Sequence, residues 1–134
     1  VSVINPAGVV VNTITVGTDP NGVAVNSNGY VYVANSGSGT VSVINPAGRV
    51  VDTIAVGPNP QGVAISSTGA TAGYVYVANG DAGTVSVINP AGVVVNTIDL
   101  GAFAYGVAVS PTGDNAGNVY ITNFSNGTVS VISA

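Results

Sequence analysis

One octapeptide recurs along the chain and constrains the fold more than any other feature. Val-Ser-Val-Ile-Asn-Pro-Ala-Gly begins at Val1, Val41 and Val85, and a shortened copy begins at Val129. The copies are separated by 40 residues once and by 44 residues twice. Periods of this size are typical of propellers and solenoids, in which each repeat packs only against its neighbours. The pattern predicts one repeat domain over residues 1–134, with repeats at about 1–40, 41–84 and 85–128 and a partial repeat at 129–134.

Within each repeat, short runs of β-branched residues alternate with turn sequences. In the second repeat the predicted strands are Val41–Ile44, Val50–Val56, Gly62–Ile65 and Tyr74–Val77. The segments between them are rich in Pro, Gly and Asn, which favour turns, and they are short enough to make the strands antiparallel. Two of these strands are apolar on both faces, as expected for a sheet that is covered on both sides. The sequence therefore predicts an all-β chain of four-stranded antiparallel meanders, the blades of a β-propeller.

Particular motifs resemble the YVTN-family β-propeller repeat. The matching segments are Tyr32–Asn35, Tyr76–Asn79 and Tyr120–Asn123, each followed by a Gly-containing turn and Thr-Val-Ser-Val-Ile, together with Val16–Val25 and Ser110–Gly113. The resemblance covers essentially the whole chain, but the third repeat lacks the family's proline at Gly101–Gly106. It implies a propeller of the kind found in archaeal and bacterial surface-layer and other exported proteins, usually without catalysis.

The predicted strands amount to three blades plus one strand. A closed propeller has about 4 to 8 blades, so one such chain does not close a ring. Three arrangements remain open: a fragment of a longer propeller, a six-bladed ring of two chains, or a head-to-tail filament. In the ring, the last blade takes its outer strand from residues 9–16 of a partner. The strands expected to join copies carry Val1, Val3 and Ile4 at one end and Val129, Val131 and Ile132 at the other.

The composition excludes several classes of function. Only 4% of residues are charged, Arg49 is the sole basic residue, and His, Cys, Lys and Glu are absent. One arginine cannot neutralise a nucleic acid backbone, and no apolar run approaches the roughly 20 residues of a membrane helix. Without His or Cys there is no nucleophilic triad, so we expect no enzyme, no cofactor and no metal. Asp81 or Asp114 alone lacks the converging oxygens that calcium requires.

Three aromatic residues distinguish the third repeat. Phe103, Tyr105 and Phe124 replace polar or small residues of the other repeats, and antiparallel pairing of their strands places them on one rim. Such a cluster can bind a glycan or a protein surface. The alternative, which the pattern favours, is that it caps the array or packs under a neighbouring subunit. The loop that contains Phe124 also holds two N-glycosylation sequons, at Asn123 and Asn126.

The sequence thus predicts a non-enzymatic structural or protein-interaction module that self-assembles through its terminal blades. A charge-poor surface rich in Ser, Thr, Asn and Gly is typical of an extracellular or cell-surface protein. The competing prediction is a ligand- or glycan-binding propeller that acts through the aromatic rim of the third repeat. The expected partners are other copies of the chain, and also glycans or other surface proteins.

Overall fold

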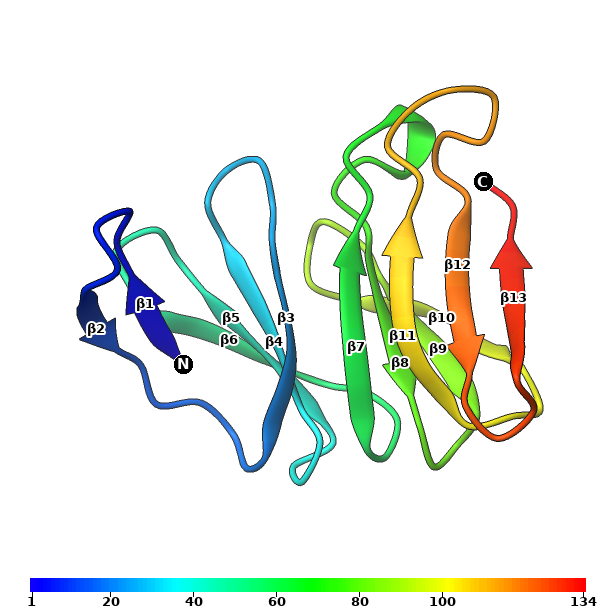
Figure 1. Ribbon diagram of the computed structural model, residues 1–134, viewed down its shortest axis with the longest axis horizontal. Helices are drawn as coiled ribbons and strands as arrows, with labels where there is room; N and C mark the ends of the chain where they lie inside the picture. The colour runs from blue at the N-terminus through cyan, green and yellow to red at the C-terminus, as the bar shows by residue number, and fades with distance from the viewer.

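The computed structural model describes residues 1–134 as four antiparallel sheets in which the strands follow chain order (Figure 1). The N-terminal hairpin pairs β1 (Ser2–Ile4) with β2 (Val10–Thr13). Blade 1 contains β3 (Pro20–Val25), β4 (Val31–Asn35), β5 (Thr40–Ile44) and β6 (Val50–Ala55). Blade 2 contains β7 (Pro60–Ile65), β8 (Val75–Asn79), β9 (Thr84–Ile88) and β10 (Val94–Asp99). Blade 3 contains β11 (Ala104–Val109), β12 (Val119–Asn123) and β13 (Thr128–Ile132).

These 13 strands confirm the predicted all-β fold of three blades plus one strand. The sole helical element is a 3-10 turn, η1 (Gly69–Thr71), in the loop before β8. None of the helical structure is long and apolar enough to cross a bilayer.

Three strand boundaries of blade 2 differ from the sequence prediction: β7 begins two residues earlier, β8 begins one residue later, and β8 ends two residues later, at Asn79. β7 begins at Pro60, which pairs with Asn79, and the register shifts before Val63. Proline is tolerated there because it occupies the first residue of the strand, where its missing N–H interrupts no ladder. β8 begins one residue after Tyr74, whose backbone N–H donates to Thr71 O and whose carbonyl accepts from Ser66 N. Tyr74 therefore closes the preceding loop.

The inner strands of successive blades approach closely because each carries a glycine. A Cβ added at Gly22 of β3 would lie 2.4 Å from the carbonyl oxygen of Gln61 in β7. A Cβ added at Gly62 of β7 would lie 2.6 Å from the carbonyl oxygen of Tyr105 in β11. Backbone-to-backbone approach of this kind leaves no room for a side chain. The recurring Gly-Val-Ala pattern is thus required by the packing of inner strands.

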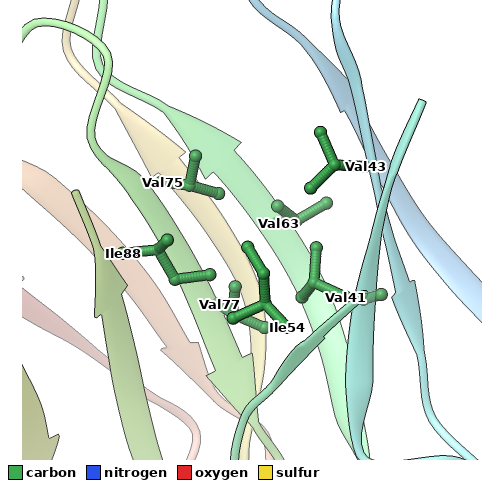
Figure 2. Packing of buried hydrophobic residues seen from close by; sticks show 8 residues of the cluster. Val41, Val43, Ile54, Val63, Val75, Val77 and Ile88 are labelled. Atoms are coloured by element: carbon green, nitrogen blue, oxygen red, sulfur yellow. The ribbon is translucent and has the colours of Figure 1, made fainter. Parts of the chain in front are cut away.

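Each gap between blades is filled by small branched side chains. The cluster between blades 1 and 2 comprises Ala34, Val41, Val43, Ile54, Val63, Val75, Val77 and Ile88. Figure 2 shows Val41, Val43 and Ile54 of blade 1 facing the side chains of blade 2. An equivalent cluster, which includes Val85, Val87 and Ile121, joins blades 2 and 3. Burial of apolar area between sheets therefore holds the blades together.

Candidate functional site

One edge of the blades gathers the loops that the sequence singled out. β3, β7 and β11 begin on this edge, and β4, β8 and β12 end on it, because paired strands run antiparallel (lower edge in Figure 1). We call this edge the rim. It consists of residues 17–21, 36–39, 57–61, 80–83, 99–105 and 124–127.

The rim of blade 3 is aromatic. The rings of Phe103 and Phe124 meet edge to face with centroids 6.2 Å apart, and Tyr105 lies 6.1 Å from Phe124. The two loops are tied by a backbone hydrogen bond, in which Phe124 N donates to Phe103 O at 2.8 Å. Phe124 is 76% exposed and Tyr105 is 47% exposed. The structure brings the three predicted residues together, and their binding role stays a prediction.

The rims of blades 1 and 2 are polar at the corresponding positions. Asp19 and Asn59 stand where blade 3 has Phe103, and both adopt a left-handed backbone with φ of 51° and 52°. Asp and Asn tolerate this region better than most residues. Asn59 Nδ2 donates to Asp81 Oδ1 at 2.9 Å. This carboxylate therefore joins two rim loops of blade 2.

The same contact belongs to a hydrogen-bonded chain that crosses two blades. Asn21 Nδ2 donates to Gln61 Oε1, and Gln61 Nε2 donates to Asn59 Oδ1, which continues to Asp81. Gln61 is buried. Sequence reasoning missed this network. The available signal was an amide residue after the proline in both of the first two repeats, at Asn21 and Gln61.

Two openings lie along the rim and share Asp81. The larger, of about 500 Å³, lies between blades 1 and 2 and has no hydrophobic side chain in its lining, which includes Asp19, Asn59 and Asp81. The smaller, of about 320 Å³, lies between blades 2 and 3 and is bordered by Asp81 and Phe103. Nowhere do three acidic side chains converge on one point. The larger opening offers carboxylate and amide oxygens, and the smaller has the Asp81 side chain and the Phe103 ring in one lining.

Every charged side chain on the rim is acidic. Asp19, Asp81 and Asp99 lie there, whereas Arg49 lies in the turn after β5, on the opposite edge of the sheets. Asp99 Oδ1 accepts a hydrogen bond from Gly101 N at 2.9 Å, the turn-capping role expected of such residues. The rim therefore carries negative charge that no basic side chain offsets locally.

The two sequons differ in accessibility. Asn123 is 5% exposed, and its Nδ2 donates to Thr128 Oγ1 at 3.0 Å and to Ser130 Oγ at 2.9 Å. This amide is packed inside blade 3, and the glycosylation of Asn123 stays a prediction. Asn126 is exposed, and its glycosylation stays a prediction.

The predicted assembly strands present apolar side chains at both ends of the array. At one end Val129 is 57% and Val131 is 56% exposed, while Ile132 packs partly against the second core cluster. At the other end Val3 is 39% and Ile4 is 62% exposed. The remaining residue, Val1, is half-buried, and its terminal amine donates to Ile14 O at 2.7 Å. Neither end is covered as the inner blades are.

Comparisons with known proteins identify the fold. The NHL repeat model matches residues 18–44, which run from the rim through β5. A comparison with curated proteins finds no match. Among solved structures, the chain is similar to hydrazine synthase of Kuenenia stuttgartiensis, with a TM-score of 0.71 and 22% identity over 95% of this chain and 41% of that one.

Two further solved structures give the same result. The Myceliophteria thermophila Cps50 (Swd1) β-propeller domain has a TM-score of 0.75 and 16% identity over 92% of this chain and 36% of that one. Virginiamycin B lyase of Staphylococcus aureus has a TM-score of 0.67 and 19% identity over 87% of this chain and 42% of that one. At these identities the likeness shows the fold alone. The chain is a β-propeller repeat protein that spans less than half the length of these three solved structures.

Proposed function

We propose that the chain is a non-enzymatic protein-interaction module of a YVTN-type extracellular surface protein, and that copies of it associate through their end blades. The propeller fold and the NHL match support an interaction module. The repeated motifs and the charge-poor composition support the surface-protein assignment. The absence of His and Cys from the sequence supports a role without nucleophilic or histidine acid–base catalysis.

One observation carries the self-association. Val41 and Val85 are completely buried, and Val129, which occupies the same position of the repeat, is 57% exposed. In the first two cases the next blade covers the valine, and in the third no sheet does. Because the local sequences are identical, the exposed face of β13 has the shape and chemistry of an interface between blades. Exposed apolar faces of this kind mark interaction surfaces.

A second copy carries the complementary face. On β3, Val23 is 57% and Val25 is 61% exposed, whereas Val63, the counterpart of Val23 in β7, is 7% exposed beneath blade 1. When blade 3 of one copy packs on the exposed face of β3 in another copy, the contact repeats the packing between blades that is already present within the chain. The two ends are different surfaces, so such contacts are heterologous and form a ring or a filament.

The outer edge of β13 fits a strand from the same second copy. β1 pairs with β2 in the register Val3↔Asn12 and Ile4↔Val10, with the same offset between strands as β5 and β6 of blade 1. Since β13 repeats the β1 sequence, β2 of a second copy can pair with β13 in this register. That exchange completes a four-stranded blade and satisfies the free backbone groups of the edge.

Particle size tests the proposal. We expect light scattering to show assemblies whose mass rises with concentration, with six-bladed rings of two copies or long fibres in electron micrographs. The double variant Val129→Asp, Val131→Asp places charge on the end face and is expected to give monomers with unchanged circular dichroism. Val51→Asp is the matched control, because Val51 is similarly exposed, at 54%, but lies on outer strand β6 of blade 1. A monomeric parent chain at all concentrations would overturn self-association.

A further inference from the structure

The aromatic cluster of blade 3 is not required by the fold. Blades 1 and 2 form the same inner sheet pairings with polar or small residues at the three positions. Those residues are Asp19 and Asn59 for Phe103, Asn21 and Gln61 for Tyr105, and Ser36 and Gly80 for Phe124. None of the three aromatic residues belongs to either core cluster. Phe103 is half-buried against Gly80 of blade 2, whereas Tyr105 and Phe124 add exposed rings to the surface.

The cluster holds a large exposed apolar ring next to negative charge. Both phenylalanines of the chain are in it, and Phe124 is 76% exposed. Asp81 borders the same opening as Phe103, whose ring meets that of Phe124. Ring faces attract cations, and so does a carboxylate. The two neighbouring groups select the same kind of ligand.

The distribution of charged side chains favours a cationic ligand at the rim. All three charged side chains of the rim are aspartates, and the single arginine lies on the opposite edge. A neutral glycan would use the rings and the hydrogen-bonding groups but gain nothing from this charge. A guanidinium is planar, stacks on aromatic faces and pairs with carboxylates. Charge complementarity therefore favours a cationic polypeptide over a saccharide.

We propose that this rim binds an arginine-containing polypeptide segment, with a guanidinium stacked on the aromatic cluster of Phe103 and Phe124 and paired with Asp81. The openings of about 500 and 320 Å³ share Asp81, and together they extend the surface from Asp19 past Phe103. An extended segment lying along them passes several acceptor groups, including Asn59. The site adjoins the end face of blade 3, because Gly80, the counterpart of Phe124, lies against Phe103 of the next blade.

The test uses two labelled peptides and fluorescence anisotropy. One is a Gly-Ser peptide with three arginines, and the other has citrulline, which is uncharged and of similar shape, in place of each arginine. The binding is measured on the Val129→Asp, Val131→Asp background, so that the outcome does not depend on self-association. We expect the arginine peptide to bind at least about tenfold more tightly than the citrulline peptide, which corresponds to one stacked and paired cation.

Substitutions locate the site. Phe124→Ser introduces the residue that blade 1 carries at this position, and is expected to weaken binding about tenfold while the thermal unfolding curve stays unchanged. Asp81→Asn is expected to weaken binding about fivefold or more and to flatten its salt dependence. Asp114→Asn, an exposed acid in the loop between β11 and β12, is the matched control and should leave binding unchanged.

Three outcomes would overturn the proposal. The first is equal affinity for the arginine and citrulline peptides. The second is unaltered binding by both the Phe124→Ser and the Asp81→Asn variants. The third is tight binding of a neutral oligosaccharide, such as a chitin tetramer, to both the parent and the Asp81→Asn variant, together with no binding of the arginine peptide. That result would make the rim a glycan site.

Discussion

The Asn79 side chain donates a 2.8 Å hydrogen bond from Nδ2 to Ser86 Oγ, and both residues are buried in blade 2. The contact recurs between Asn35 and Ser42 at 3.0 Å and between Asn123 and Ser130 at 2.9 Å. In each blade the asparagine ends the second strand and the serine lies in the third. These hydrogen bonds join the second and third strands of each blade near the rim.

Removing the serine hydroxyl should destabilise blade 2. Ser86→Ala leaves the buried Asn79 amide without one of its two acceptors, and such a loss costs about 1–3 kcal/mol. We expect the free energy of unfolding to fall by that amount, as measured by urea denaturation of the monomeric background. Ser130→Ala is the control, because Ser130 is only half-buried and water can replace its hydroxyl. Equal losses in both variants would contradict this account.

Val85 and Val129 occupy the same repeat position, but only Val85 is buried, so replacing each with alanine should lower the free energy of unfolding by different amounts. Val85→Ala removes two methyl groups from a fully buried site and leaves a cavity, so unfolding should become easier by about 1–3 kcal/mol. Val129→Ala at the exposed end face should change the stability of the monomer by less than about 0.5 kcal/mol. Paired denaturation curves check the difference, and a large loss for Val129→Ala in a monomer would refute it.

The close approach of inner strands predicts that replacing Gly62 with alanine destabilises the fold. In Gly62→Ala the new methyl group would lie 2.6 Å from the Tyr105 carbonyl oxygen, so β7 and β11 must separate. Overpacking of this kind costs about 1–3 kcal/mol. At the same repeat position Gly106 faces only the Thr122 side chain, whose Oγ1 would lie 3.1 Å from the new methyl. Thermal melts should therefore show a smaller loss for Gly106→Ala, and the reverse order would be incompatible with this packing.

Two tyrosines make stability fall in alkali. Burial, with a smaller contribution from Tyr30 and then Asp52, raises the pKa of Tyr32 above its ordinary value of 10.0. Burial also raises the pKa of Tyr76, against a hydrogen bond to Thr71 that lowers it. The unfolded chain releases these protons first, so their contribution to stability is present below pH 10 and is lost as pH rises through the folded pKa.

Absorbance titration should show that the Tyr32 and Tyr76 phenols ionise above the ordinary pKa of tyrosine. Tyr76→Phe has no proton to release, so its stability should decline less steeply above pH 10 than that of the parent chain. Tyr105→Phe serves as the control, since Tyr105 is exposed. Parallel stability profiles for Tyr76→Phe and the parent would contradict the assignment.

Much of the blade could be predicted because its signals are local. The Asn-Pro-Ala-Gly turn at residues 45–48 and the branched run before it specify a hairpin without reference to the rest of the chain. The rim position of Phe103 and Phe124 followed from antiparallel pairing alone. The boundary at Pro60 and the burial of Asn123 were missed, because a strand end and a buried amide depend on which partner groups lie opposite.

By itself, the sequence determined the repeat, the four-stranded meander and the incomplete blade at each end, since strand and turn propensities act over a few residues. Only the tertiary structure decided which copies of one motif are buried: Val41 and Val129 have the same neighbours in sequence and opposite exposures. The tertiary structure also decided the side-chain hydrogen-bond network from Asn21 to Asp81, which joins residues of different blades. Burial and long-range hydrogen bonds depend on the adjacent sheet, and no local pattern encodes whether that sheet is present.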